Sequence, residues 1–266
     1  MYKANKSLGQ HFLKDQQVIF DIVKAMDLRK NSQIVEIGPG TGALTQKILQ
    51  TISEIHVIEI DGNLIPILKK KCSSYGKIII YNQDVLSVDF HKIFSKNSIK
   101  LHIVGNLPYN VASPILFYFL NYKDVIGKVT VMLQKEMADR VVAPISNKTY
   151  GRLSVMMQYH FKCKGLFNVS RYAFSPIPKI ESRIVQLIPI DRNDVVDNYN
   201  LFSSLVRHFF QQRRKKISNS LKFFLPAKKL HDIDIDLAMR PENLSVDDFI
   251  LLSNLVNKFY LTTLNN

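Results

Sequence analysis

The chain has 266 residues, 46% of them hydrophobic, which is enough to bury one full-sized core and leave room for a small second domain. Lys and Arg number 36 against 22 Asp and Glu, and the formal net charge of +14 favours a polyanionic partner, either nucleic acid or an acidic membrane surface. No stretch approaches the roughly 18 consecutive apolar residues of a membrane-spanning helix. Residues 1–10 lead into no apolar core of the kind a secretory signal has. We therefore expect a cytoplasmic protein with no membrane partner.

The two cysteines, Cys72 and Cys163, stand far apart in the sequence, which favours reduced thiols over a disulfide framework. The histidines show no pairing at metal-ligand spacing. His160 and Cys163 form a single H-x-x-C, whereas a zinc site needs four protein ligands, or three and a water. We predict no metal centre.

Short β-rich apolar runs alternate with helical stretches along the first part of the chain. The runs are residues 34–37, 55–60, 78–81, 101–104 and 129–133. This alternation predicts an α/β fold in which helices cover a Rossmann-like, mostly parallel sheet. Further on, residues 167–169 and 184–188 bracket a loop that contains Pro176 and Pro178, and two strands there would finish the sheet as a late antiparallel hairpin.

The character of the sequence changes after the second strand of that hairpin. A polar stretch comes first, and a helical repeat of apolar residues then begins at Leu201. Ser245 and Asp248 have the spacing of a capping box that opens a last amphipathic helix. We expect two domains, with residues 1–191 carrying the sheet and residues 192–266 forming a small all-helical domain.

A glycine-rich loop follows the first predicted strand. Residues 38–42 are Gly-Pro-Gly-Thr-Gly, and residues 43–49 have the pattern of a helix. Such a loop holds a cofactor in most folds of this type, but its spacing also satisfies the degenerate dinucleotide fingerprint. Glu36, two residues before the first glycine, fits poorly beside a pyrophosphate and well beside a cation. S-adenosylmethionine carries a sulfonium, an ammonium and no phosphate, so we favour it as the cofactor.

Two more acidic residues follow predicted strands at the same edge of the sheet. Glu59, at the end of the second strand, would accept hydrogen bonds from both ribose hydroxyls, as an acidic residue does in either cofactor family. Asp84, after the third strand, would accept one from the adenine amino group of the cofactor. Both residues therefore join the glycine loop in the predicted cofactor site.

Asn106-Leu107-Pro108-Tyr109, at the end of the fourth predicted strand, is the most specific signal in the chain. The N6 of adenine is a poor nucleophile because its lone pair is delocalised into the ring, so acceptors that bind its hydrogens favour attack on a methyl group. The side-chain oxygen of Asn106 and the peptide carbonyl of Leu107 would be those acceptors, held by the rigid turn at Pro108. Tyr109 would stack on one face of the base and Phe174 on the other.

These segments together resemble the KsgA (RsmA) family of small-subunit ribosomal RNA adenine dimethyltransferases, and the resemblance spans nearly the whole chain. Besides the glycine loop it rests on residues 6–13, 106–110, 133–140, 150–154, 174–182 and 240–245. It implies a class I methyltransferase sheet and an enzyme that uses S-adenosylmethionine to dimethylate N6 of two adjacent adenosines. These would lie in a 3'-terminal hairpin loop of 16S rRNA and be modified during 30S ribosome biogenesis. The residues that the resemblance assigns to the cofactor are His11, Leu13, Gly38, Glu59, Asp84 and Asn106. We expect a monomer that acts on ribosomal RNA within a pre-30S particle.

A strongly basic segment lies in the expected helical domain. Residues 200–229 contain eight Lys or Arg and no Asp or Glu. The candidate phosphate contacts in this segment are Arg207, Arg213, Arg214, Lys215 and Lys216. We expect the neighbouring Phe209 and Phe210 to pack the domain rather than stack on bases. An adenine must leave its stack to reach a buried methyl donor, and this costs least in an unstacked RNA loop.

Three alternatives remain open. The chain can keep the cofactor fold and act as a ribosome-assembly or transcription factor, it can be an Erm-type enzyme that methylates adenine in large-subunit rRNA, or it can be an NAD-dependent oxidoreductase. The presence of Glu59, Asp84 and Asn106 favours an enzyme over the first. Residues 134–140 and 240–245 resemble the small-subunit enzymes more than the Erm branch. The acidic residue before the glycine loop disfavours the oxidoreductase.

Overall fold

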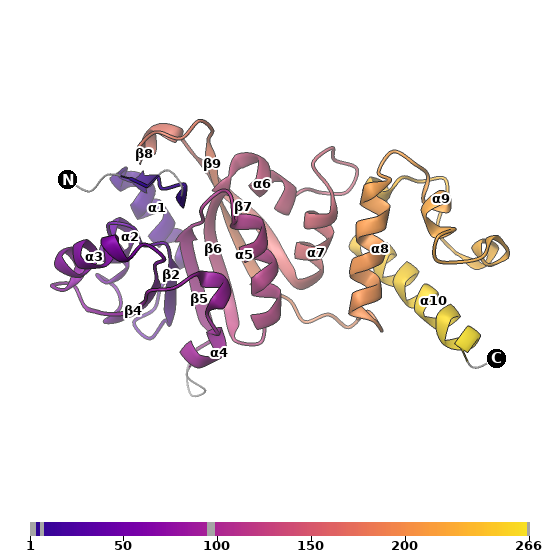
Figure 1. The fold of residues 1–266 in the computed structure, drawn as a ribbon, viewed down its shortest axis with the longest axis horizontal. Helices are drawn as coiled ribbons and strands as arrows, with labels where there is room; N and C mark the ends of the chain where they lie inside the picture. The colour runs from indigo at the N-terminus through magenta and orange to yellow at the C-terminus, as the bar shows by residue number, and fades with distance from the viewer. Residues whose placement is uncertain (1–3, 6–7, 95–98, 265–266) are drawn as a thin grey trace. The chain divides into compact units, whose positions relative to one another are not determined.

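The computed structural model describes residues 4–5, 8–94 and 99–264 (Figure 1). The chain separates into two compact units. One comprises the described residues up to 138 together with residues 161–189, and the other comprises residues 139–160 and the described residues from 190 onward. The chain thus passes from one unit to the other near the expected boundary, but residues 139–160, expected in the first domain, pack in the second unit. The division into domains 1–191 and 192–266 stays a prediction.

The sheet of the first unit is mostly parallel. Its order is β4 (Lys77–Tyr81), β3 (Glu54–Ile58), β2 (Ile34–Ile37), β5 (Leu101–Asn106), β6 (Ile126–Gln134), β9 (Ser182–Pro189) and β7 (Phe161–Val169). The pairs from β4 to β6 are parallel, and β9 is antiparallel to both β6 and β7. The predicted parallel sheet and late antiparallel hairpin are therefore confirmed.

Helices cover this sheet because its central strands are apolar on both faces (Figure 1). All four residues of β2 are buried. The helices are α1 (Gln16–Met26), α2 (Ala43–Ile48), α3 (Ile65–Cys72), α4 (Phe90–Ile93), α5 (Ala112–Phe119) and α6 (Lys135–Val141), the last of which continues into the second unit. Asp15 caps the N-terminus of α1, where its carboxylate accepts hydrogen bonds from the N–H groups of Gln17 and Val18. It buries Ile19, Ile22 and Met26 against the core.

A second, two-stranded sheet ties the start of the chain to the late hairpin. Strand β1 (Phe12–Leu13) pairs antiparallel with β8 (Phe174–Ser175). Leu13 is in register with Phe174. Figure 1 shows β8 beside the start of the chain. The N–H of Lys14 extends the contact by donating to the carbonyl of Ala173 at 2.9 Å. This pairing fixes the segment that precedes α1 near the end of the main sheet.

The described residues of the second unit form helices and turns and no regular strand. The helices are α7 (Arg152–His160), α8 (Tyr199–Gln211), α9 (Ile217–Leu221) and α10 (Val246–Leu264), with short 3-10 turns η6 (Ala227–Asp232) and η7 (Pro241–Asn243). The predicted capping box opens α10, because the Asp248 N–H donates to Ser245 Oγ at 3.0 Å and the Ser245 N–H donates to the Asp248 carboxylate at 2.8 Å. Phe209 is fully buried with its ring 5.8 Å from Phe249, which confirms its packing role.

Within the described ranges, none of the helices combines the length and the apolar character that crossing a bilayer requires.

Candidate active site

The carboxyl ends of β2, β3 and β5 meet at one edge of the main sheet. Ile37 at the end of β2 is in register with Ile58 on one side and Gly105 on the other. The residues that follow these strand ends surround a cavity of about 160 Å³. Its lining includes Gly38, Gly40, Glu59, Asp84, Asn106, Leu107, Pro108 and Tyr109. The structure therefore brings these predicted site residues together around one cavity, as expected for residues that follow parallel strands.

A second, smaller cavity of about 50 Å³ adjoins the first. The two have lining residues in common, namely His11, Phe12, Gly38, Gly40 and Asn106. The smaller one also reaches Leu13, Glu36 and Thr41. Paired cavities suit an elongated ligand with a nucleoside at one end and an amino acid at the other. The residues present therefore fit S-adenosylmethionine.

The backbone of the glycine loop packs closely against two side chains, those of Phe12 and Cys72. Gly40 has a φ of +57°, and a Cβ there would lie 2.9 Å from the Phe12 ring. Gly42 has a φ of +85°, and a Cβ there would lie 2.6 Å from Cys72 Sγ. Side chains would therefore be both strained and obstructed at these positions. The Gly40 N–H faces inward and donates to Glu59 Oε2 at 3.2 Å.

Two buried carboxyl groups flank the loop. Glu59 is 5% exposed and accepts the N–H groups of Gly40 and Asp61. Burial raises the pKa of Glu59, and these hydrogen bonds work against the rise. Glu36 is 2% exposed, its carboxyl accepts the Thr45 hydroxyl at 2.6 Å, and burial raises its pKa to about 8. A cation beside Glu36 would favour the charged form again, in keeping with the expected ammonium of the cofactor.

Asp84 is exposed and lines the cavity at the start of the 3-10 turn η3 (Val85–Ser87). Its Oδ1 accepts the N–H of Leu86 at 2.9 Å. This hydrogen bond fixes the carboxylate at the rim, where a ligand's amino group is expected.

Asn106 carries the most informative contact in the site. Its Nδ2 donates to the main-chain carbonyl of His11 at 3.0 Å, which sets the orientation of the amide. Its Oδ1 is buried and has no hydrogen-bond partner among the described residues. A buried acceptor without a donor is costly, typically by about 1 to 3 kcal/mol, and such cases point to a ligand that supplies the donor.

Tyr109 is positioned by contacts from two other segments. Its hydroxyl shares a hydrogen bond of 2.8 Å with Ser182 Oγ, and Ser182 is fully buried at the start of β9. Its ring is stacked with the His11 imidazole, with centroids 6.0 Å apart and planes inclined by 27°. Pro108 lies in the turn before α5, where its carbonyl accepts the N–H of Val111 at 3.1 Å. The predicted rigid turn is present.

Phe174 requires a correction. The hypothesis placed its ring against the free face of a target base, but the side chain is fully buried in the core with Ile19, Ile22 and Met26, and it does not line either cavity described above. Pairing of β8 with β1 turns it inward. Loop prolines stiffen a segment without fixing the direction of the aromatic residue before them, so the sequence pattern was insufficient here.

His11 and Leu13 both reach the site from the N-terminal segment. His11 contributes its carbonyl to Asn106, while its Nδ1 lies 2.8 Å from the carbonyl of Pro176. Leu13 lines the smaller cavity. Lys6 and Ser7, which begin the segment that carries the resemblance, lie outside the described residues.

Sequence reasoning missed two contacts that shape the site. Gln10 Nε2 donates to Asp61 Oδ2 at 2.7 Å and so joins the N-terminal segment to the residues after β3. Ser182 holds Tyr109, as described above. Gln10 and Ser182 lie within segments that carry the family resemblance, and that resemblance was the one signal that could have indicated them. Neither residue has a distinctive spacing of its own.

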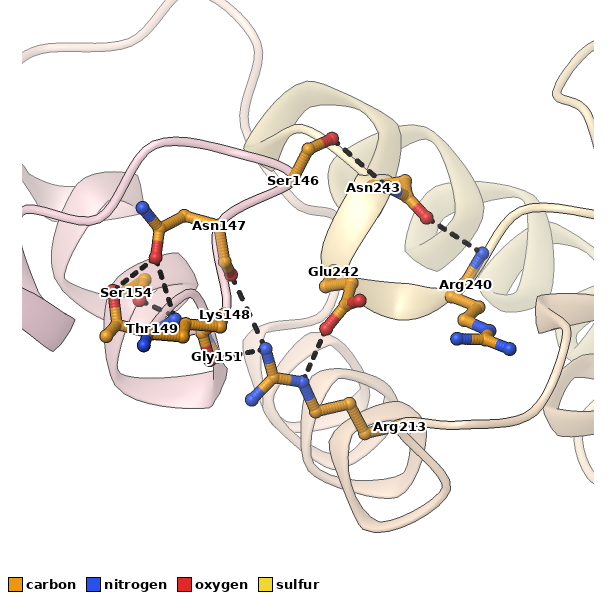
Figure 2. Close-up of polar contacts among 10 residues, drawn as sticks. All are labelled: Ser146, Asn147, Lys148, Thr149, Gly151, Ser154, Arg213, Arg240, Glu242 and Asn243. Atoms are coloured by element: carbon orange, nitrogen blue, oxygen red, sulfur yellow. Dashed lines mark hydrogen bonds and ion pairs between the residues drawn. The ribbon is translucent and has the colours of Figure 1, made fainter.

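The predicted RNA contacts lie in the second unit and differ from one another. Arg207, Arg214, Lys215 and Lys216 are exposed. Arg213 instead donates from Nε to Glu242 Oε2 at 2.6 Å and from Nη2 to the carbonyl of Lys148 at 2.6 Å (Figure 2). These contacts give Arg213 a structural role within the unit, and its predicted contact with a phosphate stays a prediction.

Comparison with known proteins gives a consistent result over nearly the whole chain. The family model described as Ribosomal RNA adenine dimethylase matches residues 1–258. The Ribosomal RNA small subunit methyltransferase A of Francisella tularensis subsp. tularensis (strain WY96-3418) is 42% identical over 257 residues, covering 96% of this chain and 98% of that protein.

Solved structures agree. A dimethyladenosine transferase from Plasmodium falciparum superposes with a TM-score of 0.81 at 27% identity, covering 94% of this chain and 98% of that one. The 23S rRNA methyltransferase ErmE superposes with a TM-score of 0.70 at 25% identity, covering 92% and 99%. These neighbours confirm the predicted class I methyltransferase fold and S-adenosylmethionine as the methyl donor. The chain belongs to the Ribosomal RNA adenine dimethylase family.

Proposed function

We propose that this enzyme transfers methyl groups from S-adenosylmethionine to N6 of two adjacent adenosines in a 3'-terminal hairpin loop of small-subunit rRNA. It acts as a cytoplasmic monomer on a pre-30S particle. The small-subunit substrate is supported by the activity for which the Francisella tularensis relative, 42% identical to this chain, is named. The observation that carries the chemistry is the buried Oδ1 of Asn106, an oriented acceptor that has no donor among the described residues.

The proposed reaction assigns the cofactor to the two adjoining cavities. Glu59 and Asp84 hold the adenosine half, and the glycine loop with Glu36 holds the amino acid half. S-adenosylmethionine supplies an electrophilic methyl group on its sulfonium. Gly38 and Asn106 line both cavities and so lie where the two adjoin. In this proposal the methyl group and the target nitrogen would meet at that point.

In this proposal Asn106 Oδ1 and the carbonyl of Leu107 accept the two N6 hydrogens of the target adenine. This draws the nitrogen lone pair out of conjugation and aims it at the methyl carbon. With the cofactor bound, the N6–methyl bond would form as the methyl–sulfur bond broke, S-adenosylhomocysteine would be the leaving group, and the surplus N6 proton would pass to solvent afterwards. Tyr109, held by Ser182, stacks on the base. Positioning of this kind contributes up to about 7 to 11 kcal/mol in well-aligned systems.

The deciding experiment supplies the protein with methyl-labelled S-adenosylmethionine and small ribosomal subunits that lack the modification. We expect labelled N6,N6-dimethyladenosine in the digested small-subunit RNA and none in large-subunit RNA offered in parallel. Label in the large-subunit RNA alone would overturn the small-subunit assignment in favour of the activity named for ErmE. No label in either RNA, with S-adenosylmethionine bound, would favour the assembly-factor alternative.

A further inference from the structure

An aromatic stack with one exposed end lies within the basic segment of the second unit. The His208 ring, on α8, lies parallel to the Phe223 ring, which follows α9, with centroids 4.6 Å apart and planes inclined by 19°. Phe224 packs edge-on against His208 at 5.4 Å and is only 7% exposed. Phe224 is thus the buried end of the stack, His208 is the middle ring, and Phe223, which is 72% exposed, is the outer ring.

Single exposed apolar residues are common and need no explanation. Phe223 differs because its ring is held in a defined plane by a second ring instead of lying loosely on the surface. Gln212 adds to this order, since its side-chain nitrogen lies 3.2 Å from His208 Nε2. An ordered ring that leaves most of its surface open is suited to stacking on a further planar group.

The charges around the stack indicate what that group is. Arg207 precedes His208 and Lys222 precedes Phe223, and both cations are exposed. Residues 200–229 as a whole contain eight Lys or Arg and no Asp or Glu. Unpaired nucleic acid is bound in general by aromatic rings that stack on bases together with cations that contact the adjoining phosphates.

We propose that Phe223, backed by His208, is a stacking platform for one unpaired nucleobase of the RNA substrate, with Arg207 and Lys222 contacting the neighbouring phosphates. This inference rests on the proposed function in that it takes RNA as the substrate. It assigns to the second unit a contact with a base, in addition to the phosphate contacts expected of its cations.

The chain contains no tryptophan, so a Phe223→Trp variant carries a unique fluorescent probe at the platform. We expect small-subunit rRNA to quench this fluorescence by stacking, and inorganic polyphosphate, which offers charge without bases, to leave it unchanged. Tyr260→Trp on α10, at a residue that is 37% exposed, is the matched control and should respond to neither. Equal quenching of both variants by RNA, or equal quenching of Phe223→Trp by RNA and polyphosphate, would overturn the platform.

Affinity gives a second, independent readout. Phe223→Ala should weaken rRNA binding roughly 5- to 150-fold without changing its salt dependence, Phe223→Tyr should restore it, and Tyr260→Ala should bind as the wild type does. If Phe223→Ala binds as tightly as the wild type, the platform is refuted while methylation by the wild type still stands. Failure of the wild type to methylate small-subunit RNA would instead refute the proposed function.

Discussion

The orientation of the Asn106 side chain is fixed by a hydrogen bond to the N-terminal segment. Its amide nitrogen is committed to the His11 carbonyl, so rotation of the amide would place two oxygens against each other. The orientation in which Nδ2 binds His11 and Oδ1 is left to accept a hydrogen bond from a ligand is therefore the favourable one. The N-terminal segment, far away in the sequence, thus prepares an acceptor at the end of β5 before any substrate is bound.

Replacing Asn106 tests whether the acceptor or the amide as a whole matters. Asn106→Ala should lower kcat roughly 100- to 1000-fold, as loss of one oriented polar group in a reaction centre does, with rRNA affinity retained. Asn106→Asp keeps an acceptor but loses the donor to His11, so it should retain more activity than the alanine variant. Single-turnover methylation measures both. Full activity in Asn106→Ala would refute the assigned role.

The hydrogen bond between Tyr109 and Ser182 is a positioning contact that a double-mutant cycle can isolate. Ser182→Ala and Tyr109→Phe should each lower kcat several-fold because the ring is no longer held in one orientation. The double variant should be little worse than either single one, with a coupling energy of about 0.5 to 1.5 kcal/mol. S-adenosylmethionine affinity serves as the control and should be unchanged. Additive losses in kcat would show that the two residues act separately.

Glu36 makes the stability of the empty protein depend on pH. Its pKa is raised from 4.5 to about 8 by burial, so the folded state holds a proton that the unfolded state releases. This contribution to stability is fully present below pH 4.5 and is lost as the pH rises through about 8. Thermal unfolding should therefore show a steeper fall in Tm toward alkaline pH for the wild type than for Glu36→Gln. S-adenosylmethionine should reduce the difference, because its cation stabilises the charged carboxylate. Parallel profiles for the two proteins would contradict this account.

The connections among elements in the second unit bring together segments that are far apart in the sequence. The loop before α7 and the turn η7 meet at Arg213, which follows the C-terminus of α8 (Figure 2). Ser146 reinforces the junction, since its N–H donates to the Glu242 carbonyl at 2.8 Å and its hydroxyl accepts the Asn243 side chain at 3.1 Å. Two of the segments that carried the family resemblance, residues 150–154 and 240–245, thus lie at or beside one structural junction.

Arg213 and Arg214 form a natural pair of test and control. Arg213→Ala should lower the free energy of unfolding by about 1 to 2 kcal/mol, because Glu242 and the Lys148 carbonyl lose a donor, though the partial exposure of the ion pair limits the loss. Arg214→Ala, at an exposed position, should change it by less than about 0.5 kcal/mol. Urea unfolding of the full chain measures both. Equal stability of the two variants would contradict the structural role of Arg213.

The sequence predicted the location of those site residues whose position depends on main-chain topology alone. Gly38, Glu59 and Asn106 lie at or just after the carboxyl ends of parallel strands. Parallel strands bring these ends to one edge of the sheet regardless of side-chain conformation. Phe174 and Arg213 depended instead on the direction and partners of a single side chain, which are settled by packing between distant segments. The same reason explains why Gln10, Ser182 and the β1–β8 pairing were missed.

Charge is distributed over the chain as a whole, but its effect on RNA binding depends on where the cations lie. The net charge of +14 attracts any polyanion, so affinity alone does not identify a binding surface. The salt dependence of binding is more specific, because it reports the number of phosphates that are neutralised by direct contact. Two runs of three exposed cations permit a matched comparison, residues 214–216 after α8 and residues 69–71 at the end of α3.

Replacing Arg214, Lys215 and Lys216 together by alanine should weaken rRNA binding and reduce the slope of log K against log salt by up to about 0.9 for each phosphate contact that is lost. The same replacement of Lys69, Lys70 and Lys71 removes an equal charge from the other unit and should leave the slope close to that of the wild type. Filter binding across a salt series with small-subunit rRNA measures the slopes, and unfolding curves confirm that both variants fold. If the two variants flatten the slope equally, net charge rather than the segment after α8 governs binding. A change confined to the variant at 214–216 identifies that segment as the surface that contacts the RNA backbone.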